Sequence, residues 1–109
     1  MILYKEASKT PKANCLFMPG IPGRIKDFAI FDDLVKENIN VYFHQYPGTH
    51  GNEGEFTIDT ATESLNDSIS KLNAKEIPLI LIAFSFSTLP VITLDFTQYK
   101  NIISLSFFS

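Results

Sequence analysis

Short apolar segments alternate with amphipathic segments along this chain, and this alternation limits the fold more than any other feature. The apolar segments have the length of strands, and the segments between them repeat apolar residues with helical spacing. The predicted strands are residues 2–7, 13–18, 39–46, 79–84 and 102–107, and the predicted helices are residues 26–36, 57–72 and 85–96. This order predicts an α/β fold with three layers, in which helices cover both faces of a mostly parallel sheet.

The predicted helices differ in how clearly their sequence marks them. In the first two, apolar side chains recur on one face, and Thr57 or Asp59 can cap the start of the second. The third contains Pro90, which must lie in the first turn of the helix or kink it. The two apolar stripes are Phe28, Phe31, Leu34 and Val35 in the first helix, and Ala61, Leu65, Ile69 and Leu72 in the second.

Length and charge limit the class of protein. The 109 residues suffice for a single domain or for a piece of a larger one, and no repeat or linker divides them. Lys and Arg number 9 against 12 Asp and Glu, which argues against a nucleic-acid binder with a basic stripe. The longest apolar run, residues 77–84, is far shorter than the about 20 residues that span a membrane. With no secretory signal at the N-terminus, we expect a cytoplasmic protein.

Cysteine and histidine are scarce. Cys15 is the single cysteine, so the chain has no internal disulfide and no cysteine-rich zinc site, and we interpret it as an inert buried thiol. The two histidines, His44 and His50, are too few for a His-rich metal site. We therefore predict neither a metal nor another cofactor. His44 falls within a predicted strand and is interpreted as structural, and His50 as a loop histidine.

The segment Ala83-Phe84-Ser85-Phe86-Ser87 carries the clearest indication of chemistry. A buried strand runs directly into a small-X-Ser-X-small turn, and a helix is predicted to follow. Such a turn holds the central serine in a strained bend with its hydroxyl exposed, and the start of the next helix favours an oxyanion nearby. A simpler interpretation is that Ser85 only caps the helix.

Two other strand ends carry unusual sequence and share the same predicted edge of the sheet. They read Phe-Met-Pro-Gly-Ile-Pro-Gly at residues 17–23 and Gln-Tyr-Pro-Gly-Thr-His-Gly at residues 45–51. Together with the turn around Ser85, their order and spacing resemble the α/β-hydrolase superfamily from about residue 13 to the C-terminus. The resemblance implies that Ser85 is the nucleophile and that the backbone N–H groups of Ile21 and Phe86 stabilise the oxyanion. It also implies the strand order 39–46, 13–18, 79–84, 102–107, with residues 2–7 as an antiparallel edge strand.

The chain also departs from the family pattern. Pro19 replaces a common histidine, while Ala83 and Ser87 replace glycines of the nucleophile turn but remain small. The acid and the histidine of the triad follow the nucleophile in this family, yet only Phe108 and Ser109 follow the last predicted strand. Asp95 is the one acid after Ser85, and we expect it at the far end of the third helix, away from the site.

We therefore expect residues 1–109 to be a single, incomplete domain, the N-terminal portion of an α/β hydrolase. The complete protein would hydrolyse an ester, thioester or amide by acyl transfer, whereas this chain alone would be a poor catalyst. A different interpretation is a non-catalytic remnant or binding module that uses its loops or the exposed strand 102–107, through which copies could associate. A phosphate-binding protein ranks last, because residues 19–23 lack the glycine spacing and the lysine of phosphate loops.

Overall fold

The computed structural model describes residues 1–20, 28–48 and 54–108. Within these ranges the helices are α1 (Ala29–Lys36), α2 (Ile58–Asn73) and α3 (Thr88–Ile92). The strands are β1 (Ile2–Lys5), β2 (Ala13–Met18), β3 (Ile39–Phe43), β4 (Leu79–Phe84) and β5 (Ile102–Phe108). Single 3-10 turns lie at Ser85–Ser87 and Phe96–Gln98. In the part of the chain described, no helix combines the length and apolar character needed to cross a bilayer.

The described strands form one mixed sheet in the order β1-β3-β2-β4-β5. The strands β3, β2, β4 and β5 are parallel to their neighbours, and β1 pairs with β3 in the antiparallel direction. The predicted strand order and the antiparallel edge strand are therefore confirmed. Because β2 and β4 are parallel neighbours with Met18 opposite Ala83, the segments that follow them start side by side.

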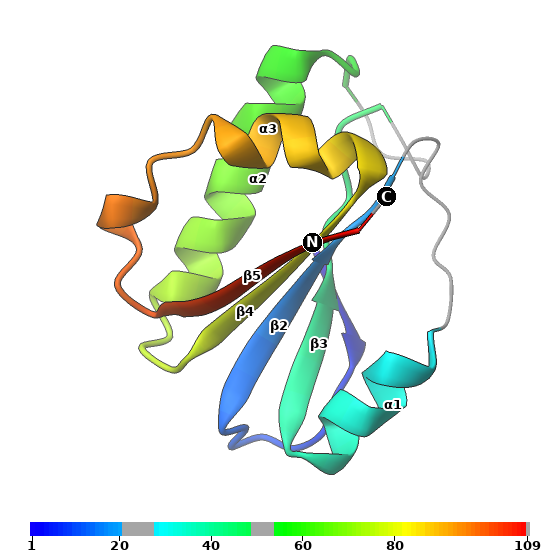
Figure 1. The fold of residues 1–109 in the computed structure, drawn as a ribbon, viewed down its shortest axis with the longest axis vertical. Coiled ribbons are helices and arrows are strands. Elements are labelled where there is room, and N and C mark those ends of the chain that lie inside the picture. Colours follow the sequence, from blue (N-terminus) through cyan, green and yellow to red (C-terminus); the bar gives the residue numbers. More distant parts are fainter. Residues whose placement is uncertain (21–27, 49–53, 109) are drawn as a thin grey trace.

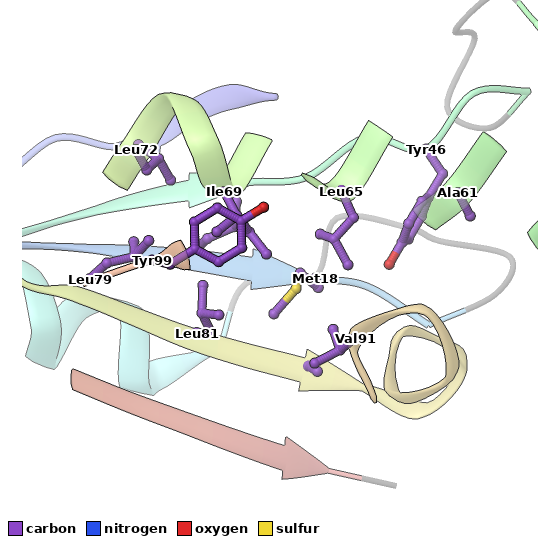
Figure 2. Close-up of a cluster of buried hydrophobic side chains, with 12 residues drawn as sticks. Met18, Tyr46, Ala61, Leu65, Ile69, Leu72, Leu79, Leu81, Val91 and Tyr99 are labelled. Carbon is purple, nitrogen blue, oxygen red and sulfur yellow. The ribbon is translucent and has the colours of Figure 1, made fainter. Parts of the chain in front are cut away.

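Side chains of the central strands alternate between two cores, one on each face of the sheet. Leu16 and Met18 of β2 face α2 and α3, whereas Cys15 and Phe17 face α1. The ribbon in Figure 1 shows α1 on one side of the sheet and α2 with α3 on the other. Figure 2 shows the α2 side, where Leu65, Ile69 and other residues of α2 point onto the strands.

The second helix forms as its sequence predicts. Thr57 is the N-cap: its hydroxyl accepts a hydrogen bond from the Thr60 N–H (3.0 Å), and the Thr60 hydroxyl accepts one from the Thr57 N–H (2.9 Å). This reciprocal pair satisfies donors that the first turn of a helix leaves unpaired. The predicted stripe of Ala61, Leu65, Ile69 and Leu72 is completely buried, which confirms its orientation toward the sheet.

The third helix is shorter than predicted. Instead of extending over residues 85–96, the segment forms a 3-10 turn, the five-residue helix α3 and a second 3-10 turn. Pro90 lies in the first turn of α3, as predicted, because its missing N–H is tolerated there. The helix ends where the Thr93 hydroxyl donates to the Pro90 carbonyl (2.7 Å), and Asp95 caps the following turn.

The strand predicted over residues 39–46 ends earlier, at Phe43. His44 still donates its backbone N–H to the Phe17 carbonyl (2.9 Å), but its side chain bonds to serines of α2. The Tyr46 hydroxyl likewise bonds to the hydroxyl of Ser87, in the 3-10 turn that follows β4. Polar partners away from the strand ladder therefore draw this segment out of the sheet. The first predicted helix begins at Ala29, and residues 26 and 27 lie outside the described ranges.

Candidate active site at the carboxyl edge of the sheet

Ser85 has a backbone conformation that sets it apart. Its φ is +45°, in the left-handed region, directly between β4 and the first 3-10 turn. The other described non-glycine residues with positive φ, Asn38 and Glu76, follow helix ends, where this conformation is common. Ser85 has no such context, and a left-handed conformation costs an L-residue about 1–2 kcal/mol. The strained turn predicted at Ser85 is therefore present.

The Ser85 side chain is exposed, as predicted for a serine at such a turn. Its hydroxyl makes no hydrogen bond to another described residue, and neither the 3-10 turn at Ser85–Ser87 nor helix α3 has a side-chain cap. The simpler interpretation of Ser85 as a helix cap is therefore wrong. The α3 helix that follows has only five residues, so its dipole is smaller than that of the helix predicted over residues 85–96.

Gly20 lies against Ser85. A Cβ added at Gly20 would be 3.3 Å from the Ser85 Cβ, which is closer than most side-chain contacts allow. The lack of a side chain at Gly20 therefore lets the main chain after β2 pass directly beside the serine. Ile21, the predicted oxyanion donor that follows, lies outside the described residues. The side chain of Phe86, whose N–H is the other predicted donor, packs on Tyr46 and Phe56 at ring distances of 5.7 and 5.2 Å.

Ser87 connects the three strand ends that gather at this edge. Its hydroxyl donates to the Pro19 carbonyl after β2, and it lies 2.5 Å from the Tyr46 hydroxyl after β3. Ser87 and Tyr46 are essentially fully buried, and Figure 2 shows the Tyr46 ring beside Ala61 of α2. Burial raises the pKa of Tyr46 to about 12, so its hydroxyl keeps the proton. The sequence pattern marked Ser87 only by its small size and did not indicate this contact.

His44 is a structural residue, as predicted from the sequence. Its Nδ1 lies 2.8 Å from the Ser68 hydroxyl and its Nε2 lies 3.2 Å from the Ser64 hydroxyl, both on α2. Burial, with a smaller contribution from the positive N-terminal amino group, lowers the pKa of His44 to about 3. A histidine with both nitrogens bonded and so low a pKa is a poor general base. His50 lies outside the described residues.

The remaining candidates have other roles. Asp95 is exposed, and its carboxylate accepts hydrogen bonds from the N–H (3.0 Å) and hydroxyl (2.6 Å) of Thr97, which lower its pKa. Cys15 is completely buried, and burial raises its pKa to about 12, which fits the inert thiol predicted. No group of three or more His, Cys, Asp or Glu side chains within residues 1–20, 28–48 and 54–108 could hold a metal ion.

The described site therefore offers one exposed hydroxyl at a strained turn, with two neighbouring strand ends held close to it. An unbonded serine hydroxyl in such a position can attack a carbonyl carbon once a base removes its proton. Comparisons with protein-family models, with curated proteins and with solved structures found no match to this chain.

Proposed function

We propose that Ser85 is the nucleophile of a serine hydrolase-like protein that transfers an acyl group from an ester, thioester or amide to water. The observation that supports this most is the positive φ of the exposed Ser85 directly after β4. Left-handed backbone at a non-glycine residue outside a helix end is a strain that functional sites tend to retain. In the proposed site, the N–H groups of Phe86 and Ile21 stabilise the oxygen that becomes negative during attack.

The proposal requires a general base and an acid. Two described candidates, His44 and Asp95, have other partners, so we propose that the base and the acid lie outside the described residues. This is the arrangement expected if residues 1–109 are the N-terminal portion of a three-layer α/β-hydrolase domain. A serine hydroxyl without its base is a weak nucleophile at neutral pH, so the chain alone should turn over slowly.

Added imidazole can test the proposal by replacing the missing base. The experiment measures p-nitrophenolate release from p-nitrophenyl acetate at increasing imidazole concentration, with the wild-type chain, Ser85→Ala and Ser104→Ala. Ser104 is a suitable control because it is also exposed but lies within strand β5, without the positive φ of Ser85. We expect an imidazole-dependent rate in the wild type and in Ser104→Ala that exceeds the rate in Ser85→Ala.

Two results would contradict this account in different ways. Equal imidazole-dependent rates in all three proteins would show that Ser85 is not the acyl acceptor. Fast turnover without imidazole that Ser85→Ala abolishes would keep Ser85 as the nucleophile. It would also show that a group in the chain supplies the base, with His50 as the first residue to replace.

The strand β5 supports a second candidate function, that of a binding module. Among the described strands β5 pairs with β4 alone, and its residues 102–108 include no charged side chain. Ile103 and Phe107 are 64% and 46% exposed. Native edge strands usually carry charge or cover that prevents pairing with another chain. We propose that two copies of this chain pair along β5, which sedimentation velocity tests by comparing the wild type with Ile103→Lys.

The charged variant should sediment as a monomer at concentrations where the wild type is larger. A wild-type chain that remains monomeric across the same concentration range would rule out pairing along β5. The hydrolase proposal does not depend on either result, because Ser85 lies at the end of β4.

A further inference from the structure

We propose that Ser87 is a positioning residue that holds the Pro19–Gly20 segment against Ser85, an inference that rests on the proposed function of Ser85. Its hydroxyl bonds to the Pro19 carbonyl and to the Tyr46 hydroxyl, so one side chain joins the segments that follow β2, β3 and β4. Pro19, Tyr46 and Ser87 are all buried. Water therefore does not compete for these bonds in the folded protein.

The direction of the two hydrogen bonds follows from counting protons. The Pro19 carbonyl can only accept, so the Ser87 hydroxyl donates its single hydrogen to it. Ser87 then has only lone pairs left for Tyr46, so the Tyr46 hydroxyl donates to Ser87. The Tyr46 hydroxyl therefore donates to Ser87, and Ser87 donates to the Pro19 carbonyl, so that each bond orients the next.

This arrangement acts on the proposed site through Gly20. The residue follows Pro19, and a Cβ there would be 3.3 Å from the Ser85 Cβ. A main chain that passes so close to the nucleophile must be held accurately, because a displacement of about 1 Å can cost about 10²-fold in rate. Ser87 lies two residues after Ser85, so it fixes the segment after β2 relative to the turn that carries the nucleophile.

The hydroxyl explains why a serine fits this position. In the family that the sequence resembles, a glycine stands here, and a glycine would leave the Pro19 carbonyl and the Tyr46 hydroxyl without their Ser87 partner. A buried carbonyl or hydroxyl without a hydrogen-bond partner is costly, so loss of the Ser87 hydroxyl should allow the Pro19–Gly20 segment to move.

Two variants and a matched control separate positioning from general stability. Ser87→Ala removes both bonds, whereas Tyr46→Phe removes the donor to Ser87 and leaves the bond between Ser87 and Pro19. Ser68→Ala is the control, because it also removes a buried hydroxyl, the one bonded to His44. For each protein we would measure the NMR order parameter of the Gly20 amide and the imidazole-dependent acylation rate of Ser85.

We expect the Gly20 order parameter to fall from about 0.85 to below about 0.6 in Ser87→Ala, to fall less in Tyr46→Phe, and to stay unchanged in Ser68→Ala. The acylation rate should decrease in the same order, by about 10²-fold in Ser87→Ala. If Ser87→Ala does not fold, Tyr46→Phe still tests the proposal, since it should loosen Gly20 more than the control does.

An ordered Gly20 in both Ser87→Ala and Tyr46→Phe would overturn the positioning role. A loosened Gly20 with an unchanged acylation rate would overturn its importance for the reaction. If Gly20 loosens but Ser85 is not acylated even in the wild type, the proposed function fails while the contact made by Ser87 is confirmed. The order parameter therefore distinguishes failure of this inference from failure of the hydrolase proposal.

Discussion

Two buried polar clusters lie side by side at the carboxyl edge of the sheet, and they are held in different ways. In one, His44 bonds to Ser64 and Ser68, so it fixes the end of β3 to helix α2. In the other, Ser87 bonds to Tyr46 and Pro19, so it fixes three strand ends to one another. The rings of His44 and Tyr46 connect the clusters with a centroid distance of 4.5 Å.

The two clusters differ most in how their stability should depend on pH. The His44 cluster contains a group that must stay neutral to remain buried, because the pKa of His44 is lowered to about 3. The Ser87 cluster contains hydroxyls, and the pKa of Tyr46 is raised to about 12, so neither hydroxyl ionises near neutral pH. Acid should therefore destabilise the first cluster and leave the second unchanged, so substitutions are the suitable test of the second.

The largest effect should come from acid. In the unfolded chain a histidine binds a proton with a pKa near 6.5. In the folded protein the pKa of His44 is about 3, so His44 stays neutral until the pH falls to that value. Folding stability from this group is thus complete above pH 6.5 and is lost as the pH falls toward 3. Between pH 6.5 and pH 4 the loss should be about 3 kcal/mol, at about 1.4 kcal/mol per pH unit. Urea unfolding at several pH values measures it.

The variant His44→Gln isolates this contribution from the carboxylates that also titrate. Glutamine can bond to the two serines of α2 but takes up no proton in this range. Its free energy of unfolding should change less steeply between pH 4 and pH 6.5 than that of the wild type. Parallel pH profiles for the two proteins would mean that His44 is not buried in its neutral form.

A smaller effect should follow from breaking the Ser87 cluster. Ser87→Ala removes the hydrogen bond that Ser87 makes to each of two buried polar groups and should cost about 1–3 kcal/mol, while Tyr46→Phe should cost about 1 kcal/mol. Because both variants remove the same contact, the double variant should lose less than the sum of the two losses. Strict additivity in urea unfolding would show that the two hydroxyls do not interact.

The smallest effect should come from an exposed polar contact. Lys5 of β1 and Asp32 of α1 are 3.1 Å apart, but the Asp32 side chain is 61% exposed. Asp32→Asn should therefore reduce the free energy of unfolding by less than about 1 kcal/mol, and the loss should shrink with added salt. A loss as large as that of Ser87→Ala would mean that burial does not explain the difference between these contacts.

Local patterns in the sequence predict most of the fold. The strands β2 and β4 begin and end at the residues predicted for them, and α2 follows its stripe from the Thr57 cap. The predicted third helix is too long because apolar residues continue past Ile92, whereas α3 ends there, where the Thr93 hydroxyl donates to the Pro90 carbonyl. Helix ends depend on such individual hydrogen bonds more than on periodicity.

The sequence predicts less of the candidate site than of the fold. The small-X-Ser-X-small pattern indicates the turn at Ser85, because it requires only local backbone geometry. The contact between Tyr46 and Ser87 joins residues 41 positions apart, and no periodicity relates them. One signal is present in the sequence resemblance, in which a glycine stands at the position of Ser87, because a serine that is buried there needs a hydrogen-bond partner.

The central claim, that Ser85 is placed to attack a carbonyl carbon, can be tested without any base. Ser85→Cys provides a thiol that ionises near pH 8.5 and attacks unaided, and Ser104→Cys provides the same thiol within strand β5, without a positive φ. Cys15 adds little background, because it is buried and its pKa is raised to about 12. For each variant we would measure acylation by p-nitrophenyl acetate and alkylation by iodoacetamide.

Only acylation develops an oxyanion, so the ratio of the acylation rate to the alkylation rate reports oxyanion stabilisation. Differences in how exposed the two thiols are affect both rates and therefore cancel in the ratio. One oxyanion donor contributes about 10²–10³-fold in rate. We predict that this ratio is at least about 10-fold higher in Ser85→Cys than in Ser104→Cys. Equal ratios in the two variants would contradict the assignment of Ser85 as a nucleophile.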